Sequence, residues 1–379
     1  MTAAALALAF VAAALFAWSY LVYPALIRAR AASVAPWAPA GHAPPLSVEV
    51  VLAAADEESV IAARVANLLG QAGVADLSVA IGCDGCRDRT AALAREAGAG
   101  RVRVVEFATR RGKAAVVNDL VRDSTADLIV FTDANTRFEP GAVAALARAF
   151  GDAGVGAACG RLLFERGAGA RETPESEFWD RETRMKEAEG ALGICLGANG
   201  GIYAARRGLV LPLPEDTTSM DDFLIPVRVA RDGHRIVFAG DAVAREDAAR
   251  DVAAEVSRRV RIGIGGGQVL RRERWLYVAG AHPLLTLAFL SRKAARWLAP
   301  LSALVAAAAA LFSPLLALPG AAALAGALLL LAIARARPRL GGAAGRLYYF
   351  GVLNVALALG VAAGLAGYAR PVWTRTARS

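Results

Sequence analysis

The segment 128–135 constrains the fold most, because an apolar run ends there and side chains with oxygen ligands follow at once. Its first four residues, Leu-Ile-Val-Phe, are typical of a buried strand. Asp133 and Asn135 come after them, two residues apart. Alternate residues of an extended segment point to the same side, so both side chains can meet one cation. This pattern indicates an α/β protein that presents a metal at a strand end.

Strand-like and helix-like segments alternate between residues 46 and 270. The expected strands are 48–52, 77–81, 102–107 and 128–132, with helices after each; Pro140 is expected to begin the last of these helices. This order predicts an α/β domain with a mostly parallel sheet and helices on both faces. Ligands of such sheets bind beyond the carboxyl ends of the strands, so Glu57, Asp84 and Asp133 are expected to meet in one crevice. Each acid taken alone could instead cap a helix.

Apolar runs of membrane length stand at both ends of the chain, and 56% of its 379 residues are hydrophobic. Residues 3–27 carry no charge and suffice for a bilayer span, which needs about 20 apolar residues. A signal peptide is the alternative, but no basic residues precede the run. Arg28 and Arg30 follow it, which places the next domain in the cytoplasm by the positive-inside rule.

Three more apolar runs, 298–318, 321–333 and 347–366, predict about three C-terminal transmembrane helices, with a tight turn at Pro319-Gly320. The amphipathic stretch from Trp275 to Trp297 predicts an interfacial helix. The expected division is a transmembrane helix (1–30), a cytoplasmic domain (46–270), an interfacial region (271–297), transmembrane helices (298–368) and a basic tail (369–379). The tail would lie outside under this count, so the number of helices stays open by one.

The net charge of +9 is assigned to arginines that flank membrane segments and meet anionic lipid, and no nucleic-acid partner is expected. Cys83 and Cys86 form a C-x-x-C without a second pair at zinc-ribbon spacing, so the cysteines are expected to be reduced. The chain contains no Walker A motif and no H-E-x-x-H. Its glycine-rich runs lack the Rossmann spacing, which argues against hydride transfer.

Six segments, in order, resemble motifs of family-2 glycosyltransferases. They are Asp56-Glu57-Glu58 (N-E-E), Asp84–Thr90 (D-G-S-x-D-G-T), Arg111-Gly112-Lys113 with Asn118 (G-K-x-x-A-L-N), Thr132–Asn135 (D-x-D), Gly197–Tyr203 (G-x-N-G-x-x-Y) and Met220–Phe223 (E-D). The resemblance covers about residues 47–270 and, with the apolar ends, is similar to the membrane-bound, cellulose-synthase-like and exopolysaccharide branch. It implies a GT-A nucleotide-sugar domain.

The resemblance also implies a role for each motif. Asp222 would be the catalytic base of an inverting transfer, and Asp133 with Asn135 would hold Mg²⁺ or Mn²⁺. The implied contacts of the nucleotide diphosphate sugar are Glu57, Asp84, Lys113, Asp133 and Arg261, and those of the acceptor are Asn199 and Asp221. A lysine after glycine at a helix start also suits phosphate on physical grounds. For Asn199, a structural role in a turn stays open.

Two departures from the family pattern bear on the reaction. Asn135 replaces the second aspartate, which predicts a weaker metal site. In the segment that resembles Q-x-x-R-W, Arg261 is kept but Ile262 stands in place of the tryptophan. This favours the addition of one or a few sugars, or a different acceptor geometry, although processive synthesis stays open.

The expected protein is therefore an integral protein of a bacterial-type inner membrane. Its expected acceptor is a lipid-linked sugar or an envelope polysaccharide, and its further partners are membrane lipid and other envelope-polysaccharide proteins. A transporter with a nucleotide-binding domain and a catalytically silent scaffold are the alternatives.

Overall fold

The computed structural model describes residues 2–35, 37–39, 46–74, 76–165, 174–247, 252–278, 280, 282–335 and 342–369. The chain divides into two compact units. The helical unit comprises the described residues of 1–27, 172–178 and 249–370, and the sheet unit comprises those of 28–171 and 179–248. Each unit is described separately below.

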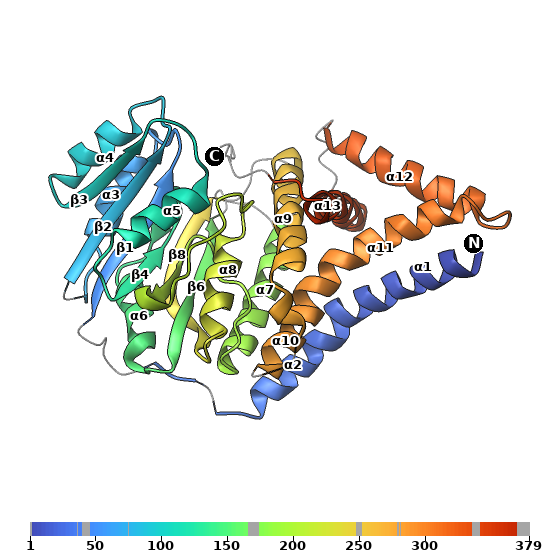
Figure 1. Cartoon of the computed structure of the whole chain (residues 1–379), viewed down its shortest axis with the longest axis horizontal. Coiled ribbons are helices and arrows are strands. Elements are labelled where there is room, and N and C mark those ends of the chain that lie inside the picture. Colours follow the sequence, from blue (N-terminus) through green and yellow to red (C-terminus); the bar gives the residue numbers. More distant parts are fainter. Residues whose placement is uncertain are drawn as a thin grey trace. The chain divides into compact units, whose positions relative to one another are not determined.

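One mixed sheet of eight strands forms the centre of the sheet unit (Figure 1). The strands are β1 Ser47–Ala54, β2 Asp76–Asp84, β3 Val102–Phe107, β4 Leu128–Phe131, β5 Thr136–Phe138, β6 Val155–Glu165, β7 Tyr203–Arg206 and β8 Arg235–Asp247, in the order β3-β2-β1-β4-β7-β6-β8-β5. The first four in this order run parallel. β7 is antiparallel to both of its neighbours, β8 is parallel to β6, and β5 is antiparallel to β8.

The predicted α/β class is confirmed, but the expectation of a mostly parallel sheet is wrong for the half that follows β4. β7 has only four residues and enters the sheet from the turns around Gly197–Gly201. Strand direction depends on such connections, and the composition of a short apolar run does not encode it.

Helices α3 to α5 follow the first three strands, as expected, and α6 follows β4 after the short strand β5. They are α3 Ile61–Leu69, α4 Thr90–Gly98, α5 Lys113–Arg122 and α6 Ala142–Arg148, with a 3₁₀ turn η2 at Ala149–Gly151. Pro140 does not begin α6 as expected. It lies in a turn two residues earlier, and the helix begins after Gly141, whose φ of 77° favours glycine.

The remaining helical segments of the sheet unit are the 3₁₀ turn η3 Arg207–Leu209, helix α8 Asp221–Ala230 and the part of α7 Pro174–Ala191 from residue 179 onward.

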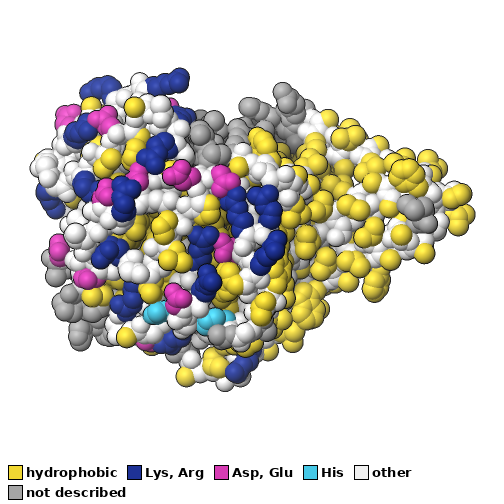
Figure 2. Space-filling view, in the orientation of Figure 1, with side chains coloured by type: hydrophobic (Ala, Val, Ile, Leu, Met, Phe, Trp, Pro, Cys, Tyr) yellow, Lys and Arg dark blue, Asp and Glu magenta, His cyan; other side chains and the backbone are white. Residues whose placement is uncertain are grey.

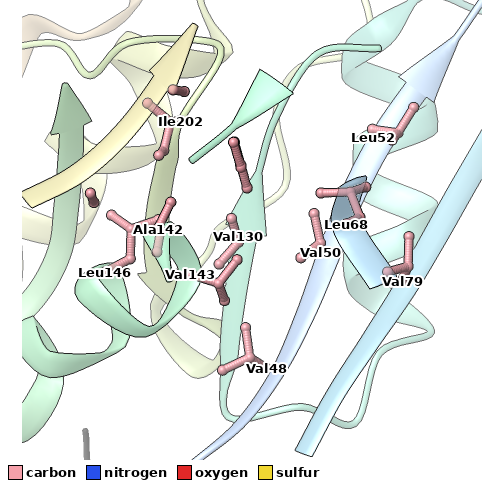
Figure 3. Close-up of a cluster of buried hydrophobic side chains, with 14 of the residues drawn as sticks. Val48, Val50, Leu52, Leu68, Val79, Val130, Ala142, Val143, Leu146 and Ile202 are labelled. Carbon is pink, nitrogen blue, oxygen red and sulfur yellow. The ribbon is translucent and has the colours of Figure 1, made fainter. Parts of the chain in front are cut away.

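The main core lies on one face of the sheet, where alternate residues of β1 meet α3 and α6 (Figure 3). Val48, Val50 and Leu52 are almost completely buried against residues such as Leu68 and Leu146. Burial of each such side chain contributes roughly 1.5–3 kcal/mol.

The opposite face of β2 determines where α5 lies. A Cβ at Gly82 would stand 2.2 Å from Val116 Cγ1, so only glycine at this position allows α5 to pack this closely. Asp84 projects from the same face as Gly82, because residues two apart in a strand share a face. The start of α5 is thereby brought next to the end of β2.

The helical unit contains most of the apolar runs. Its elements are α1 Thr2–Ala17, the π-helical turn η1 Trp18–Val22, the first residues of α2 Tyr23–Ala32, α9 Val252–Arg272, the 3₁₀ turn η4 Arg274–Tyr277, α10 Pro283–Ala288, the π-helical turn η5 Phe289–Ala294, α11 Ala295–Ala310, α12 Ala317–Arg335 and α13 Gly342–Leu365. Within the described chain, two helices are long and apolar enough to cross a bilayer, Thr2–Ala32 and Leu347–Leu365; Ala317–Ile333 is apolar but shorter.

Two expected segments differ from the structure. The run 298–318 is not one helix, because α11 ends at Ala310 and a turn occupies residues 311–316. Pro319-Gly320, the expected turn, lies instead in the first turn of α12, where a missing N–H costs little. The expectation of a continuous helix from Trp275 is also wrong. A regular helix begins only at Pro283, in the favoured first position, and continues through η5 into α11.

Helices α9 and α13 pack through facing glycines. A Cβ at Gly263 would lie 2.5 Å from Leu357 O, and one at Gly267 would lie 2.6 Å from Val361 O. From the other side, a Cβ at Gly360 or Gly364 would lie 2.3 Å or 2.1 Å from a carbonyl oxygen of α9. Small residues four apart on both helices are the pattern that lets two backbones touch. Gly263 and Gly267 therefore serve the close packing of α9 against α13.

Candidate active site

The carboxyl ends of β2, β1 and β4 place Asp84, Glu57 and Asp133 at one edge of the parallel half of the sheet. β1 lies between β2 and β4, so the three strand ends are adjacent. Asp84 is the last residue of β2, and Asp133 comes two residues after β4. Glu57 follows β1 by three residues and is half-buried, and its backbone N–H donates to Thr90 Oγ1 over 2.7 Å.

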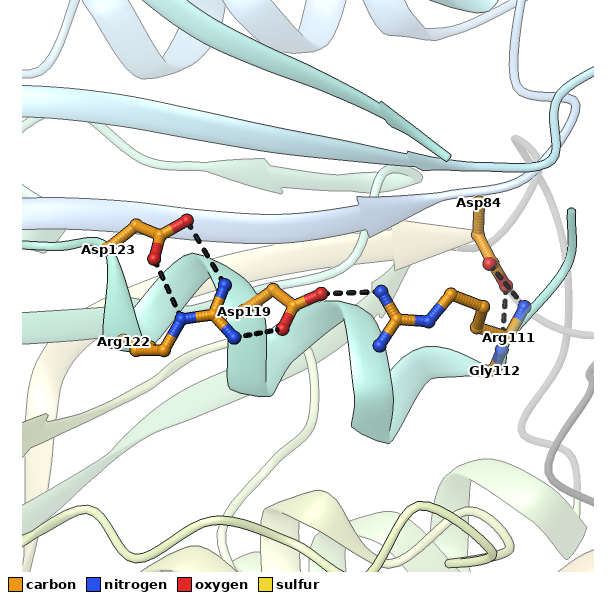
Figure 4. A network of polar contacts seen from close by, with 6 residues as sticks. All are labelled: Asp84, Arg111, Gly112, Asp119, Arg122 and Asp123. Carbon is orange, nitrogen blue, oxygen red and sulfur yellow. Dashed lines mark hydrogen bonds and ion pairs between the residues drawn. The ribbon is translucent and has the colours of Figure 1, made fainter. Parts of the chain in front are cut away.

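Asp84 fixes the loop that leads into α5 (Figure 4). Its carboxylate is completely buried and accepts hydrogen bonds from the backbone N–H groups of Arg111, at 2.7 Å, and Gly112, at 3.0 Å. Hydrogen bonds to an ionised acceptor are stronger than neutral ones. Gly112 has a φ of 98°, which a residue with a side chain rarely adopts. Asp84 thus holds the backbone immediately before Lys113.

Lys113 joins two of the predicted site acids. Its Nζ lies 2.9 Å from Asp133 Oδ1 and 3.0 Å from Asp221 Oδ2. Burial by itself would lower the pKa of Lys113, but the attraction of Asp133 and Asp221 is stronger and raises it. The ammonium therefore stays charged at neutral pH.

Asp221 and Asp222 form the first turn of α8, where carboxylates are favoured by the helix dipole. The Tyr203 hydroxyl donates to Asp221 Oδ2 over 3.3 Å. Burial, followed by the charges of Asp221, Asp222 and Asp133, raises the pKa of Tyr203 well above its ordinary value. The three carboxylates consequently share one neighbourhood around this hydroxyl, although they are far apart in the sequence.

Gly200 leaves space between two of these acids. A Cβ there would lie 3.5 Å from Asp222 Oδ2 and 3.6 Å from Asp133 Oδ2. The loop is tied to α8 by the backbone, since Ala198 N–H donates to Asp222 O over 2.7 Å. Asp133 and Asp222 therefore face the same point of the glycine loop.

Asn199 lies in this loop with both ends of its amide bonded inside the protein. Its Nδ2 donates to Gly160 O over 2.6 Å, and its Oδ1 accepts from the ammonium of Lys186, a buried residue of α7 that also donates to Ala198 O at 3.2 Å. This arrangement favours the turn role over a direct acceptor contact for Asn199. The sequence did not predict a role for Lys186, because nothing in a polar helical segment indicates which of its lysines will be buried.

We expect Lys186→Met to lower the melting temperature by several degrees. The change leaves the oxygens of Ala198 and Asn199 without their donor, which costs about 1–3 kcal/mol for a buried acceptor. Thermal unfolding checks this, with Arg184→Met as control, because Arg184 is exposed on the same helix. Equal melting temperatures for the two variants would contradict the role of Lys186.

Asp133 and Asn135 offer the oxygen donors that a hard divalent cation prefers. The two residues do not lie in one extended segment as expected, because Ala134 and Asn135 form a turn. Asp133 is the more exposed of the two acids paired with Lys113, with 35% of its side chain accessible to solvent. Asn135 Nδ2 donates to Glu246 Oε1 over 3.0 Å, which orients the amide. The strand end is braced by Arg64, a buried residue of α3 whose Nη2 donates to Thr132 Oγ1 over 2.6 Å. Burial lowers the pKa of Arg64 to about 9, and the charge of Asp133 opposes this shift.

The structure thus brings together Lys113, Asp133, Asp221 and Asp222. Asp84 acts on this group indirectly, because it binds the backbone just before Lys113. Glu57 lies at the same sheet edge, and Asn199 supports the loop. Arg261 is half-buried on α9 of the helical unit. The site contains four further polar residues, which are Tyr203, Lys186, Arg64 and Glu246. Of these, only Tyr203 had a sequence signal, as the last residue of the stretch Gly197–Tyr203.

Comparison with known proteins gives a family match and a fold match. Residues 44–265 match the family described as "Glycosyltransferase like family 2". The structure resembles the mannosyltransferase PcManGT from Pyrobaculum calidifontis, solved in complex with GDP-Man and Mn²⁺, with a TM-score of 0.67 and 22% identity over 94% of this chain and 99% of that one. This likeness establishes a GT-A-like fold.

Mannosyl-3-phosphoglycerate synthase from Rubrobacter xylanophilus is also similar, with a TM-score of 0.42 and 18% identity over 60% of this chain and 75% of that one. No curated protein sequence matches the chain.

Proposed function

Because the chain belongs to glycosyltransferase-like family 2, we propose that it is a membrane-bound, inverting enzyme that moves a sugar from a nucleotide diphosphate sugar to a lipid-linked or polysaccharide acceptor. The observation that supports this best is the cluster of Lys113, Asp133, Asp221 and Asp222 around Gly200. It combines a cation for phosphate, carboxylates for a metal, and a carboxylate for proton transfer in one place.

The donor half of the proposed site consists of Glu57, Asp84, Lys113 and Asp133. Asp133 and Asn135 would hold Mg²⁺ or Mn²⁺, which neutralises charge on a leaving diphosphate when it is bound. Asp84 has both oxygens on backbone N–H groups, so its contribution to donor binding is to position the start of α5. The complex of PcManGT with GDP-Man and Mn²⁺ makes GDP-mannose the first donor to test.

The proposed catalytic residue is Asp222. Its carboxylate would take the proton of an acceptor hydroxyl while that oxygen forms a bond to the anomeric carbon and the nucleoside diphosphate leaves. A single displacement of this kind inverts the anomeric configuration. Asp221 would keep Lys113 in place, through the contact at 3.0 Å, and would lie beside the acceptor. Arg261 is proposed to bind the diphosphate through its guanidinium, which matches phosphate geometry.

The membrane location rests on the helical unit. Many large apolar side chains are exposed on its helices (Figure 2), among them Phe10 on α1, Leu328 on α12 and Leu347 on α13. Contiguous exposed apolar surface marks contact with lipid or a partner. The positions of Arg28 and Arg30, after the first apolar run, support a cytoplasmic site.

The purified full chain is expected to release nucleoside diphosphate from one nucleotide sugar of a panel, in the presence of Mn²⁺ or Mg²⁺ and a lipid or glycan acceptor. The measurement is nucleoside diphosphate produced per enzyme, with a chelator as control. Donor binding, seen as a rise in melting temperature, without turnover for any donor and acceptor would favour the non-catalytic scaffold instead.

A further inference from the structure

The ammonium of Lys113 already contacts Asp133, the carboxylate proposed to bind the metal. This ammonium lies 2.9 Å from Asp133 Oδ1 and 3.0 Å from Asp221 Oδ2, and 24% of the lysine side chain is accessible to solvent. Asp222 and the Tyr203 hydroxyl also lie in this neighbourhood, and the charge of the Arg64 guanidinium interacts with Asp133. The positive charge of Lys113 therefore balances part of a cluster of three carboxylates.

A divalent cation at Asp133 would compete with this ammonium. Both bind the same carboxylate, and two positive charges a few ångströms apart repel one another strongly in a partly buried site. Lys113 can move without disturbing the fold, because the backbone before it is held by Asp84 while the side chain is a flexible four-carbon stem.

We infer that Lys113 couples the binding of metal to the binding of donor. In the absence of donor, the ammonium keeps Asp133 neutralised and opposes metal binding. When metal and nucleotide diphosphate enter together, the diphosphate gives the ammonium a new anionic partner, and Asp133 becomes available to the metal. The inference deepens the proposed function and rests on it, because it concerns the same site.

The test is a titration of the full chain with Mn²⁺, followed by electron paramagnetic resonance of the free ion, without nucleotide and with GDP or UDP. Binding of Mn²⁺ to nucleotide in protein-free samples is subtracted. For the wild type, we expect weak binding of Mn²⁺ alone and binding tighter by on the order of tenfold or more with nucleoside diphosphate. For Lys113→Met, we expect Mn²⁺ alone to bind roughly tenfold tighter than to the wild type, and the effect of nucleotide to shrink.

Two further variants serve as controls. Lys113→Arg keeps the charge and should bind Mn²⁺ alone as weakly as the wild type. Arg122→Met removes one charge from the other end of α5, where the Arg122 side chain is 66% exposed. Arg122 lies nine residues after Lys113, which is about 13 Å along a helix. This variant should leave both Mn²⁺ affinities unchanged.

The inference is overturned if the wild type binds Mn²⁺ tightly without nucleotide, or if folded Lys113→Met binds Mn²⁺ alone no better than the wild type. The first of these measurements needs no variant, so a folding defect cannot hide the answer. A lysine that only binds phosphate would weaken the nucleotide-dependent affinity when removed and leave Mn²⁺ alone unaffected. Failure of the proposed function would appear differently, as absent turnover, while the binding of Mn²⁺ alone would still report on Lys113.

Discussion

Asp222→Asn is expected to lower the turnover number by roughly 10²–10⁴-fold, the usual contribution of a general base, while donor binding persists. Asparagine has nearly the same shape but cannot accept the proton of an acceptor hydroxyl. The neighbouring Asp221 is a poor substitute, because Lys113 and the Tyr203 hydroxyl hold it. Initial rates of nucleoside diphosphate release, together with the donor-dependent rise in melting temperature, check this expectation.

Asp241→Asn is the matched control, since the Asp241 side chain is 84% exposed. It should leave turnover unchanged. If Asp222→Asn kept more than about a tenth of the wild-type rate, Asp222 would not be the base, and the assignment of proton transfer would pass to another group.

The second large effect is expected at the packed glycines of the helical unit. Replacing a helical glycine by alanine normally stabilises a helix by about 0.5–1 kcal/mol. At Gly364, however, the new Cβ would lie 2.1 Å from Ile264 O, so α9 and α13 would have to separate. Overpacking of this kind costs about 1–3 kcal/mol or more, and we expect Gly364→Ala to be destabilising.

Gly326→Ala in α12 provides the control, because nothing lies within 4 Å of the Cβ it would add. We expect this variant to be as stable as the wild type or slightly more so. The measurement is the thermal unfolding of both variants in detergent. An unchanged melting temperature for Gly364→Ala would mean that the two helices do not pack as closely as the structure indicates.

The parallel half of the sheet was largely predictable from sequence, and the half of mixed strand direction was not. The early strands are β-rich runs, and three of them have an acid at or just after their end. The segment 102–107 was assigned with its correct ends. β5 and β7 have only three and four residues, too few for periodicity to identify. Helix ends in the apolar runs were also missed, because alanine and leucine favour helix on both sides of a turn.

The candidate site was predictable in its acids but not in their partners. The strand ends indicated Asp84 and Asp133, and the resemblance to family-2 glycosyltransferases indicated Asp222. The pairing of Lys113 with Asp221 joins residues more than a hundred positions apart, and the burial of Lys186 depends on how α7 packs in the sheet unit. Neither follows from a local pattern. The roles of all these residues stay predictions until the variants are measured.

The ammonium group within the acidic cluster also affects how the newly made chain folds. Carboxylates that gather without a counter-charge repel one another, and a protein built that way would depend on the cell's supply of manganese or magnesium to reach its native state. Lys113 lessens that dependence, since the polypeptide itself carries part of the neutralising charge. We therefore expect the chain to reach its folded state without added manganese or magnesium.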